Sequence, residues 1–164
     1  MNDDHDFCCG ATAQLESQRE ARCAVCGQPG KPVARITLKH TVRPEFLELV
    51  TKPGFRFCRS PHCDVVYFHP DGAMLRKGDV RLRVGLKETE DPVPLCYCFG
   101  FTEAMVREEI RATGSCTIPR RITAEVKAAH CACEIRNPQG SCCLGNVTAA
   151  MRKAMRLMAA RQGP

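Results

Sequence analysis

The spacing of apolar and polar residues changes near residue 90 of the chain. Before that point, apolar and polar residues alternate in short segments, which is typical of half-buried strands. The segments predicted to form strands are 34–38, 55–57, 65–68 and 80–86. A short helix is predicted after Pro44, because proline suits the first turn of a helix and apolar residues follow it at Phe46, Leu47 and Val50.

After a charged stretch that contains two prolines, 87–94, the apolar spacing becomes helical. Thr102 is predicted to cap a first helix, which Gly114 ends. A second helix is predicted to open at Pro119 and a third at Asn146. The third helix has an apolar face and a basic face, formed by Val147, Met151, Met155 and Met158 and by Arg152, Lys153, Arg156 and Arg161.

These patterns predict an α+β protein built from two small modules. The first is a β-α-β-β module over residues 21–88. The second is a small all-helical module over residues 94–164, which ends in the basic helix. Residues 1–20 are predicted to form a flexible N-terminal tail.

The composition argues against a large apolar core. Of the 164 residues, 5% are aromatic and none is tryptophan, whereas 13 are cysteine. Small units with thin cores usually depend on metals or disulfides, and an odd number of cysteines argues against a fully paired disulfide framework. The sequence has no secretory signal and no apolar run of about 18 residues. We therefore expect a cytoplasmic protein without membrane insertion, in which clustered thiols bind metals.

Two close pairs of cysteines lie in the first module, Cys23-x2-Cys26 and Cys58-x4-Cys63. Zn²⁺ prefers four soft ligands in a tetrahedron, and two pairs on separate turns can converge on one ion. We predict a structural zinc site at these four thiolates, so that residues 21–88 form a zinc-binding module. His62 could replace Cys63 as the fourth ligand, although an exposed loop histidine is the simpler interpretation.

The second module contains seven further cysteines. Cys96 and Cys98 form a Cys-x-Cys turn before a predicted helix N-terminus, whose dipole favours anionic ligands. Iron–sulfur clusters take four cysteine thiolates, and the spacing favours a [2Fe–2S] site over a second zinc site. The preferred remaining ligands, followed by their close alternates, are Cys131 and Cys143, then Cys133 and Cys142.

Other sulfur atoms offer further sites. Cys8 and Cys9, near His5, could capture a soft ion such as Cu⁺, since thiolates prefer soft metals, or could belong to an unstructured tail. The methionines of the third helix could bind copper through their thioethers, but at helical spacing they are more often core residues. Cys116 is isolated in the sequence and is interpreted as an incidental or buried thiol.

The formal net charge is +6 when thiols are counted as neutral. Metal-bound cysteines are deprotonated, so a zinc ion or a [2Fe–2S] core with four thiolates carries a local charge of about −2. With both centres present the net charge falls to about +2, and no nucleic-acid partner is expected. No Ser-His-Asp set, paired-carboxylate motif or glycine-rich phosphate loop supports hydrolytic or nucleotide chemistry.

Several longer motifs surround these cysteines. They are Pro-Leu-Cys-Tyr-Cys-Phe-Gly-Phe-Thr at 94–102, Cys-Ala-Cys at 131–133, and the segments 137–147 and 58–68. Together they resemble the N-terminal region of CopZ-type iron–sulfur copper chaperones, and the segment 58–68 is similar to the zinc module of that family. The resemblance runs from Cys23 to Val147. The second module also resembles, more distantly, bacterioferritin-associated ferredoxin.

The resemblance implies a cytoplasmic metallochaperone with one Zn²⁺ and one [2Fe–2S] cluster, which would act as a one-electron donor that reduces Cu(II) to transiently bound Cu⁺. Copper or another soft metal would be the cargo, and a metal-transport or heavy-metal-domain protein the partner. Chaperones of this type usually continue into a heavy-metal domain with a Cys-x-x-Cys loop. These 164 residues carry a basic helix instead, so a partner is expected to supply that loop.

Two alternatives belong to other classes. The ferredoxin resemblance implies a small electron-transfer protein that docks on a reductase or a storage protein. The third interpretation is an interaction module in which both metals are structural.

Overall fold

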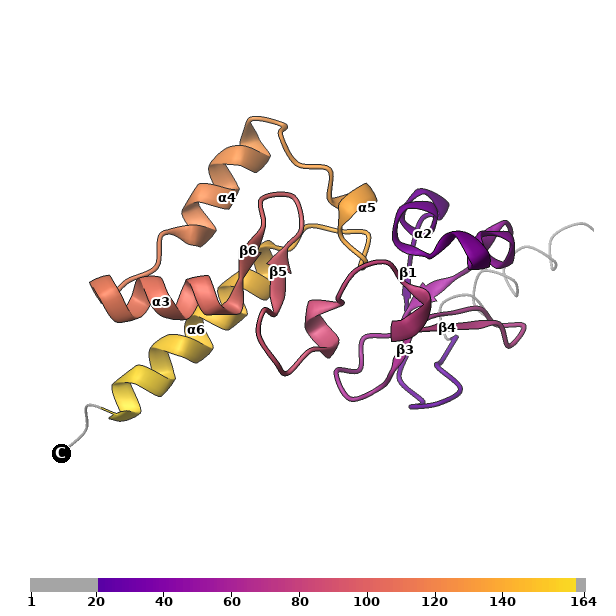
Figure 1. The fold of residues 1–164 in the computed structure, drawn as a ribbon, viewed down its shortest axis with the longest axis horizontal. Helices are drawn as coiled ribbons and strands as arrows, with labels where there is room; N and C mark the ends of the chain where they lie inside the picture. Colours follow the sequence, from indigo (N-terminus) through magenta and orange to yellow (C-terminus); the bar gives the residue numbers. More distant parts are fainter. Residues whose placement is uncertain (1–20, 162–164) are drawn as a thin grey trace, which may run out of the picture.

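The computed structural model describes residues 21–161 (Figure 1). Cys8 and Cys9 lie outside the described residues. In chain order the elements are β1 (Lys31–Pro32), α2 (Arg35–Thr41), η1 (Pro44–Val50), β2 (Arg56–Phe57), β3 (Val65–Phe68), β4 (Met74–Arg76), η2 (Lys77–Asp79), η3 (Gly85–Lys87), β5 (Pro94–Cys96), β6 (Phe101–Thr102), α3 (Glu103–Thr113), α4 (Ile118–Lys127), α5 (Cys133–Arg136) and α6 (Leu144–Arg161), where η marks a 3-10 helix. The mixed α+β class is confirmed.

The first half is built on a four-stranded antiparallel sheet with the order β1-β2-β3-β4. Its central pairing places Phe57 opposite Tyr67, and Tyr67 opposite Leu75. All four residues of β3 are buried, because α2 and the loops cover the sheet. The apolar core here consists of Leu38, Val42, Val50, Phe55, Phe57, Val66, Tyr67, Leu75, Val80 and Val84.

Two strand predictions in this half are wrong. Segment 34–38 lies mostly in helix α2, because the buried residues are Thr37, Leu38 and Thr41, which share one helical face, while Ile36 is 42% exposed. Segment 80–86 forms only an isolated bridge at its first residue and then enters η3. The other two strand predictions are confirmed, and the helix predicted after Pro44 is a 3-10 helix.

The second half packs α3 and α4 against α6. As predicted, the Thr102 hydroxyl accepts a hydrogen bond from the Met105 amide and Gly114 ends α3 with φ of 74°. The prediction that this half is all-helical is wrong, since β5 and β6 form an antiparallel pair. The helix core consists of Leu95, Cys96, Phe101, Val106, Ile110, Ile118, Ile122, Cys143, Val147, Ala150 and Ala154.

The methionine face of α6 is only partly buried. Met151 and Met158 pack against the helix core, as a core interpretation predicts, whereas Met155 is 42% exposed. Within the described residues, no helix is both long enough and apolar enough to cross a membrane.

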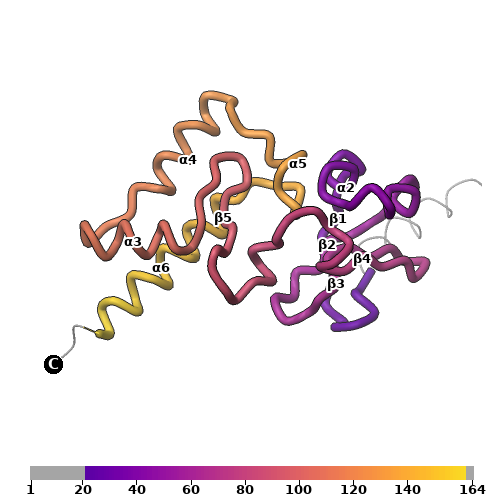
Figure 2. The backbone as a smooth tube through the Cα atoms, in the orientation of Figure 1, coloured from indigo at the N-terminus to yellow at the C-terminus, as the bar shows by residue number. Residues whose placement is uncertain are grey.

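The two halves meet through α5. Figure 1 shows the sheet and α2 at one end, the long helices at the other, and β5, β6 and α5 between them. In Figure 2 the backbone leaves α4, passes beside α2 at α5, and then enters α6. Helices α2 and α5 are in direct contact, although more than half of the chain separates them in sequence.

A tight approach at Gly85 gives a test of this arrangement. A Cβ atom at Gly85 would lie 1.7 Å from the carbonyl oxygen of Pro94, which belongs to β5 and cannot move freely. We expect Gly85→Ala to lower the free energy of unfolding by about 3 kcal/mol. Gly78→Ala is the control, because its Cβ atom would meet nothing within 4 Å. Urea denaturation followed by circular dichroism measures both, and equal stability of the two variants would contradict the contact.

Candidate metal centres

Four cysteines of the first half converge from two turns. Cys23 and Cys26 lie on a turn closed by the hydrogen bond from the Gly27 amide to the Cys23 carbonyl, 2.8 Å, and Gly27 has φ of 70°, a conformation that favours glycine. Cys58 follows β2, and Cys63 precedes β3. The sheet and the turn therefore carry two thiols each to one place.

The four sulfur atoms lie within 4.8 Å of one another. The Sγ atoms of Cys23 and Cys63 are 4.0 Å apart, and those of Cys26 and Cys58 are 3.5 Å apart. A tetrahedral zinc ion with Zn–S bonds of about 2.3 Å needs sulfur atoms about 3.8 Å apart. The set therefore fits Zn²⁺. His62, the alternative ligand, is exposed and lies outside this group.

The protonation of these thiols differs across the group. Burial opposes ionisation of Cys26, but hydrogen bonds from the Gln28 backbone and the neighbouring thiols lower its pKa to about 7. Burial raises the pKa of Cys58 to about 12 and also raises that of Cys63. Cys26 is thus the first of these three to ionise, and a bound cation is needed to hold all four thiolates.

A buried lysine, Lys87, lies beside this group. The Lys87 ammonium donates hydrogen bonds to the carbonyl oxygens of Ser60 and Cys63, at 2.8 and 3.0 Å, and lies 5.7 Å from the centre of the Phe57 ring. Lys87 is only 6% exposed. Its positive charge therefore faces the loop that carries two of the thiols.

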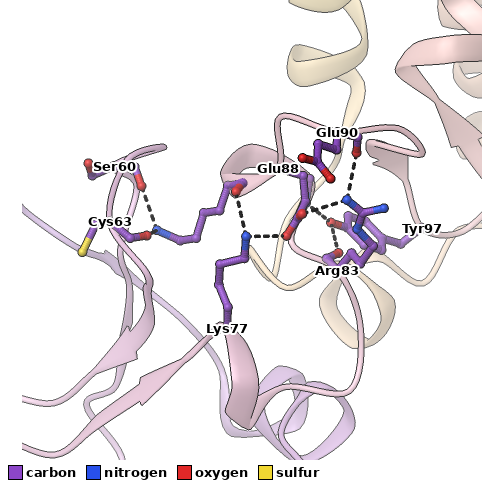
Figure 3. A network of polar contacts seen from close by, with 9 residues as sticks. Ser60, Cys63, Lys77, Arg83, Glu88, Glu90 and Tyr97 are labelled. Carbon is purple, nitrogen blue, oxygen red and sulfur yellow. Dashed lines mark hydrogen bonds and ion pairs between the residues drawn. The ribbon is translucent and has the colours of Figure 1, made fainter.

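The same network continues toward the second half (Figure 3). The Glu88 carboxylate pairs with Lys77 at 2.8 Å and with Arg83 at 2.9 Å. The Tyr97 hydroxyl donates to the Arg83 carbonyl at 3.0 Å and accepts from the Gly85 amide at 2.8 Å. Because Tyr97 lies between Cys96 and Cys98, the network links both thiol groups.

The second half brings the Cys98 and Cys133 thiols together and buries Cys96 and Cys143 in the helix core. The Sγ atoms of Cys98 and Cys133 are 3.7 Å apart, and the Ala132 amide donates to Cys98 Sγ at 3.3 Å. Cys96 and Cys143 are both buried in the helix core, where hydrogen bonding with the Cys143 thiol lowers the pKa of Cys96 to about 6 and raises the pKa of Cys143. Among the described residues, only the first thiol group meets the tight geometry of a single-ion site.

The four candidate ligands that follow Cys98 in the second half lie in different surroundings. Cys133, the alternate, makes the thiol contact with Cys98, whereas no such contact is formed by the preferred Cys131. Cys143 is buried and its neighbour Cys142 is exposed. No pattern in the sequence indicates the contact between Cys133 and Cys98, because Cys133 begins a helix of four residues that is too short to show a periodicity.

Cys116 lies apart from both groups. Its thiol donates to a carboxylate oxygen of Glu109 at 3.5 Å, and burial raises its pKa. This placement supports the interpretation of Cys116 as an incidental, partly buried thiol.

Comparison with known proteins places these sites in a family. A family model described as a zinc binding domain, of the CopZ type, matches residues 20–81, which contain all four thiols of the first group. The chain is 38% identical over 122 residues to "Copper chaperone CopZ" of Archaeoglobus fulgidus, covering 74% of this chain and 57% of that protein. The solved structure of the Archaeoglobus fulgidus CopZ N-terminal domain superposes with a TM-score of 0.67 at 32% identity, covering 79% of this chain and 96% of that one.

This chain belongs to the family of the CopZ N-terminal domain. The predicted resemblance to the N-terminal region of CopZ is therefore confirmed. The chain spans 57% of the length of the curated CopZ relative. The zinc-binding family match ends before Cys96, so it concerns the first thiol group alone.

Substitution of one thiol tests the first site. We expect Cys58→Ser to reduce zinc from about one ion per chain to almost none and to lower the melting temperature by about 10 °C or more, because a four-thiolate site contributes directly to folding. Elemental analysis and thermal denaturation measure the two effects. Cys116→Ser, which removes a thiol outside both groups, should change neither. Normal zinc content in Cys58→Ser would contradict the site.

Proposed function

We propose that this chain is a copper-handling metallochaperone with a structural Zn²⁺ on Cys23, Cys26, Cys58 and Cys63 and a [2Fe–2S] cluster in the second half. Membership of the CopZ N-terminal domain family supports the role of a copper-handling metallochaperone. The observation that carries the [2Fe–2S] proposal is the different arrangement of the two thiol groups. The first is a compact tetrad, whereas the second combines the Cys98–Cys133 contact with the buried thiols of Cys96 and Cys143.

The first group suits a structural metal. Its four thiols leave no position for a water or a substrate, and three of them are buried. Phe68 and Val65 pack around the sulfur atoms. Cargo exchange at this site would require opening of that packing, so we assign Zn²⁺ a role in folding.

The second group suits a two-iron cluster. A [2Fe–2S] cluster takes four cysteine thiolates, two on each iron, and the chain offers Cys98 with Cys133, which are in contact, and the buried thiols of Cys96 and Cys143. Cys131 remains the alternative to Cys133. When bound, such a cluster supplies one electron at a time, which is what reduction of Cu(II) to Cu(I) requires.

The chain's own residues determine access to this centre. Cys96 and Cys143 are buried, whereas Cys98 and Cys133 are half-buried and Cys142 is exposed. A copper ion, as substrate, would therefore approach the edge formed by Cys98 and Cys133. The nearby thiols of Cys131 and Cys142 are soft ligands for Cu⁺, as are Cys8 and Cys9, which lie outside the described residues.

We further propose a reducing, cytoplasmic setting and a metal-transport or heavy-metal-domain protein as partner. The name of the CopZ relative supports copper as the cargo. The boundaries proposed for the zinc-binding and cluster-binding parts are 21–88 and 94–164. The basic residues of α6 are exposed and available to a partner, namely Arg152, Lys153, Arg156 and Arg161.

Reduction of Cu(II) tests the proposed function. Chain reduced with dithionite and freed of excess reductant should yield about one Cu⁺ per cluster when mixed with Cu(II), because the cluster carries one electron. A Cu⁺-specific chromophore measures the product, and the visible absorbance of the cluster measures its oxidation. Cys98→Ser should abolish the reaction, while Cys116→Ser should retain it.

Retention of the product separates the alternatives. A metallochaperone should keep the Cu⁺ through gel filtration and should hold it less well after Cys8→Ser/Cys9→Ser. Electron transfer without retention in either protein would favour the small electron-transfer protein. Absence of electron transfer would leave only structural roles for the metals.

A further inference from the structure

Three side chains of the first half hold the segment between Cys133 and Cys143. The Thr37 hydroxyl donates to the Glu134 carbonyl at 2.5 Å, and the Tyr67 hydroxyl donates to the Pro138 carbonyl at 2.7 Å. The Lys31 ammonium donates to the Gln139 carbonyl at 3.2 Å and also contacts the Ser141 hydroxyl. We call Lys31, Thr37 and Tyr67 the clamp residues.

The centre of the clamp is inaccessible to water. Thr37, Thr41 and Tyr67 are each 0% exposed. The hydroxyl groups of Thr41 and Tyr67 are 2.9 Å apart, and Thr41 also donates to the Thr37 carbonyl at 2.8 Å. A buried hydrogen bond of this kind is costly to lose, because the carbonyl that it satisfied cannot turn to water.

The clamped segment is itself rigid. The Asn137 side chain, 1% exposed, donates to the Ser141 carbonyl at 2.6 Å and accepts from the Gln139 amide at 3.0 Å. The Asn137 amide donates to the Cys133 carbonyl at 2.9 Å. A displacement of the segment would therefore move both ends, where Cys133 and Cys143 lie.

Close packing leaves the segment little freedom at Gly140. A Cβ atom there would lie 3.0 Å from Thr37 Oγ1, and Gly140 has φ of 62°. The clamp residues thus fix the segment both by hydrogen bonds and by direct contact.

We propose that Lys31, Thr37 and Tyr67 are positioning residues that hold the Cys133 thiol against Cys98 and keep the Cys143 thiol in the helix core that also contains Cys96. This inference deepens the proposed function and rests on it for the identity of the bound group. Tyr67 lies on β3, which begins two residues after Cys63. The metal tetrad of the first half therefore orders the strand that positions the thiols of the second.

The test uses the full chain, loaded with zinc and freed of iron, so that its readout does not depend on a cluster. Iodoacetamide alkylates exposed thiols, and tandem mass spectrometry locates the label. Cys142 is exposed, whereas its neighbour Cys143 is 2% exposed, so one peptide carries both the probe and its internal reference.

We expect Tyr67→Phe and Thr37→Val to raise the alkylation rate of Cys143 about tenfold while leaving that of Cys142 unchanged, because each removes one buried hydrogen bond. Thr51→Val is the matched control, since the Thr51 hydroxyl is exposed and bonds only to the Glu48 carbonyl of its own turn. Zinc content should stay at the wild-type value in all three variants. Unchanged Cys143 reactivity in Tyr67→Phe and Thr37→Val would overturn the proposal.

Two further measurements keep the outcome decisive. If Tyr67→Phe also releases zinc, the Lys31→Met variant is used in place of Tyr67→Phe, because Lys31 is only half-buried. Normal Cys143 reactivity in Lys31→Met would then overturn the proposal.

After reconstitution with iron and sulfide, the clamp variants should lose the cluster to a chelator about tenfold faster than wild type. Failure of the wild-type chain to form any cluster, with Cys143 protection still dependent on the clamp, would reject the proposed function and retain the clamp.

Discussion

The convergence of Cys23, Cys26, Cys58 and Cys63 is the constraint on which the rest of this structure depends. The strands around it are only two to four residues long, and short sheets of this kind are marginal in water without further support. Cys58 follows β2 and Cys63 precedes β3, so one tetrahedral ion would close the central pair of the sheet. Structural zinc in small peptides contributes about 10–16 kcal/mol of apparent binding energy, which exceeds the whole stability of a typical small domain.

Two routes lead from this tetrad to the second thiol group. One runs along β3 to Tyr67 and from its hydroxyl to the segment that carries Cys133 and Cys143. The other runs from the buried ammonium of Lys87 through the η3 turn to the hydroxyl of Tyr97, which lies between Cys96 and Cys98 in the sequence. Contacts from the first half thus hold both the turn that carries Cys96 and Cys98 and the segment that carries Cys133 and Cys143. This arrangement would suit the proposed redox centre, because elements outside the second thiol group would set the geometry of its ligands.

Local signals in the sequence predicted much of the fold. The Thr102 cap, the Gly114 stop and the buried stripe of α3 depend on neighbours within a few residues, and they are confirmed. The four thiols of the first group were predicted for a related reason, since two tight turns fix their spacing and the tetrahedral ion needs four equivalent ligands.

The failures concern residues whose roles are set by distant parts of the chain. Ala34, Ile36 and Leu38 alternate as a strand would, but the helix buries Thr37 and Thr41, whose hydroxyls are satisfied by contacts absent from any local pattern. The contact between Cys133 and Cys98 is also not visible in the sequence, because α5 is placed by α2, far away in sequence, and the choice between Cys131 and Cys133 as cluster ligand stays a prediction. Polar residues in the core and short helices at an interface are therefore the features that sequence periodicity misses.

The central claim is that the two thiol groups hold different inorganic centres on one frame. Native mass spectrometry of the intact chain, purified without air, measures this directly, because the mass increments of zinc, iron and sulfide are distinct. We expect about one zinc, two irons and two sulfides per chain, because one tetrahedral ion and one four-thiolate cluster would be bound. A chain that carries two zinc ions and neither iron nor sulfide would contradict it.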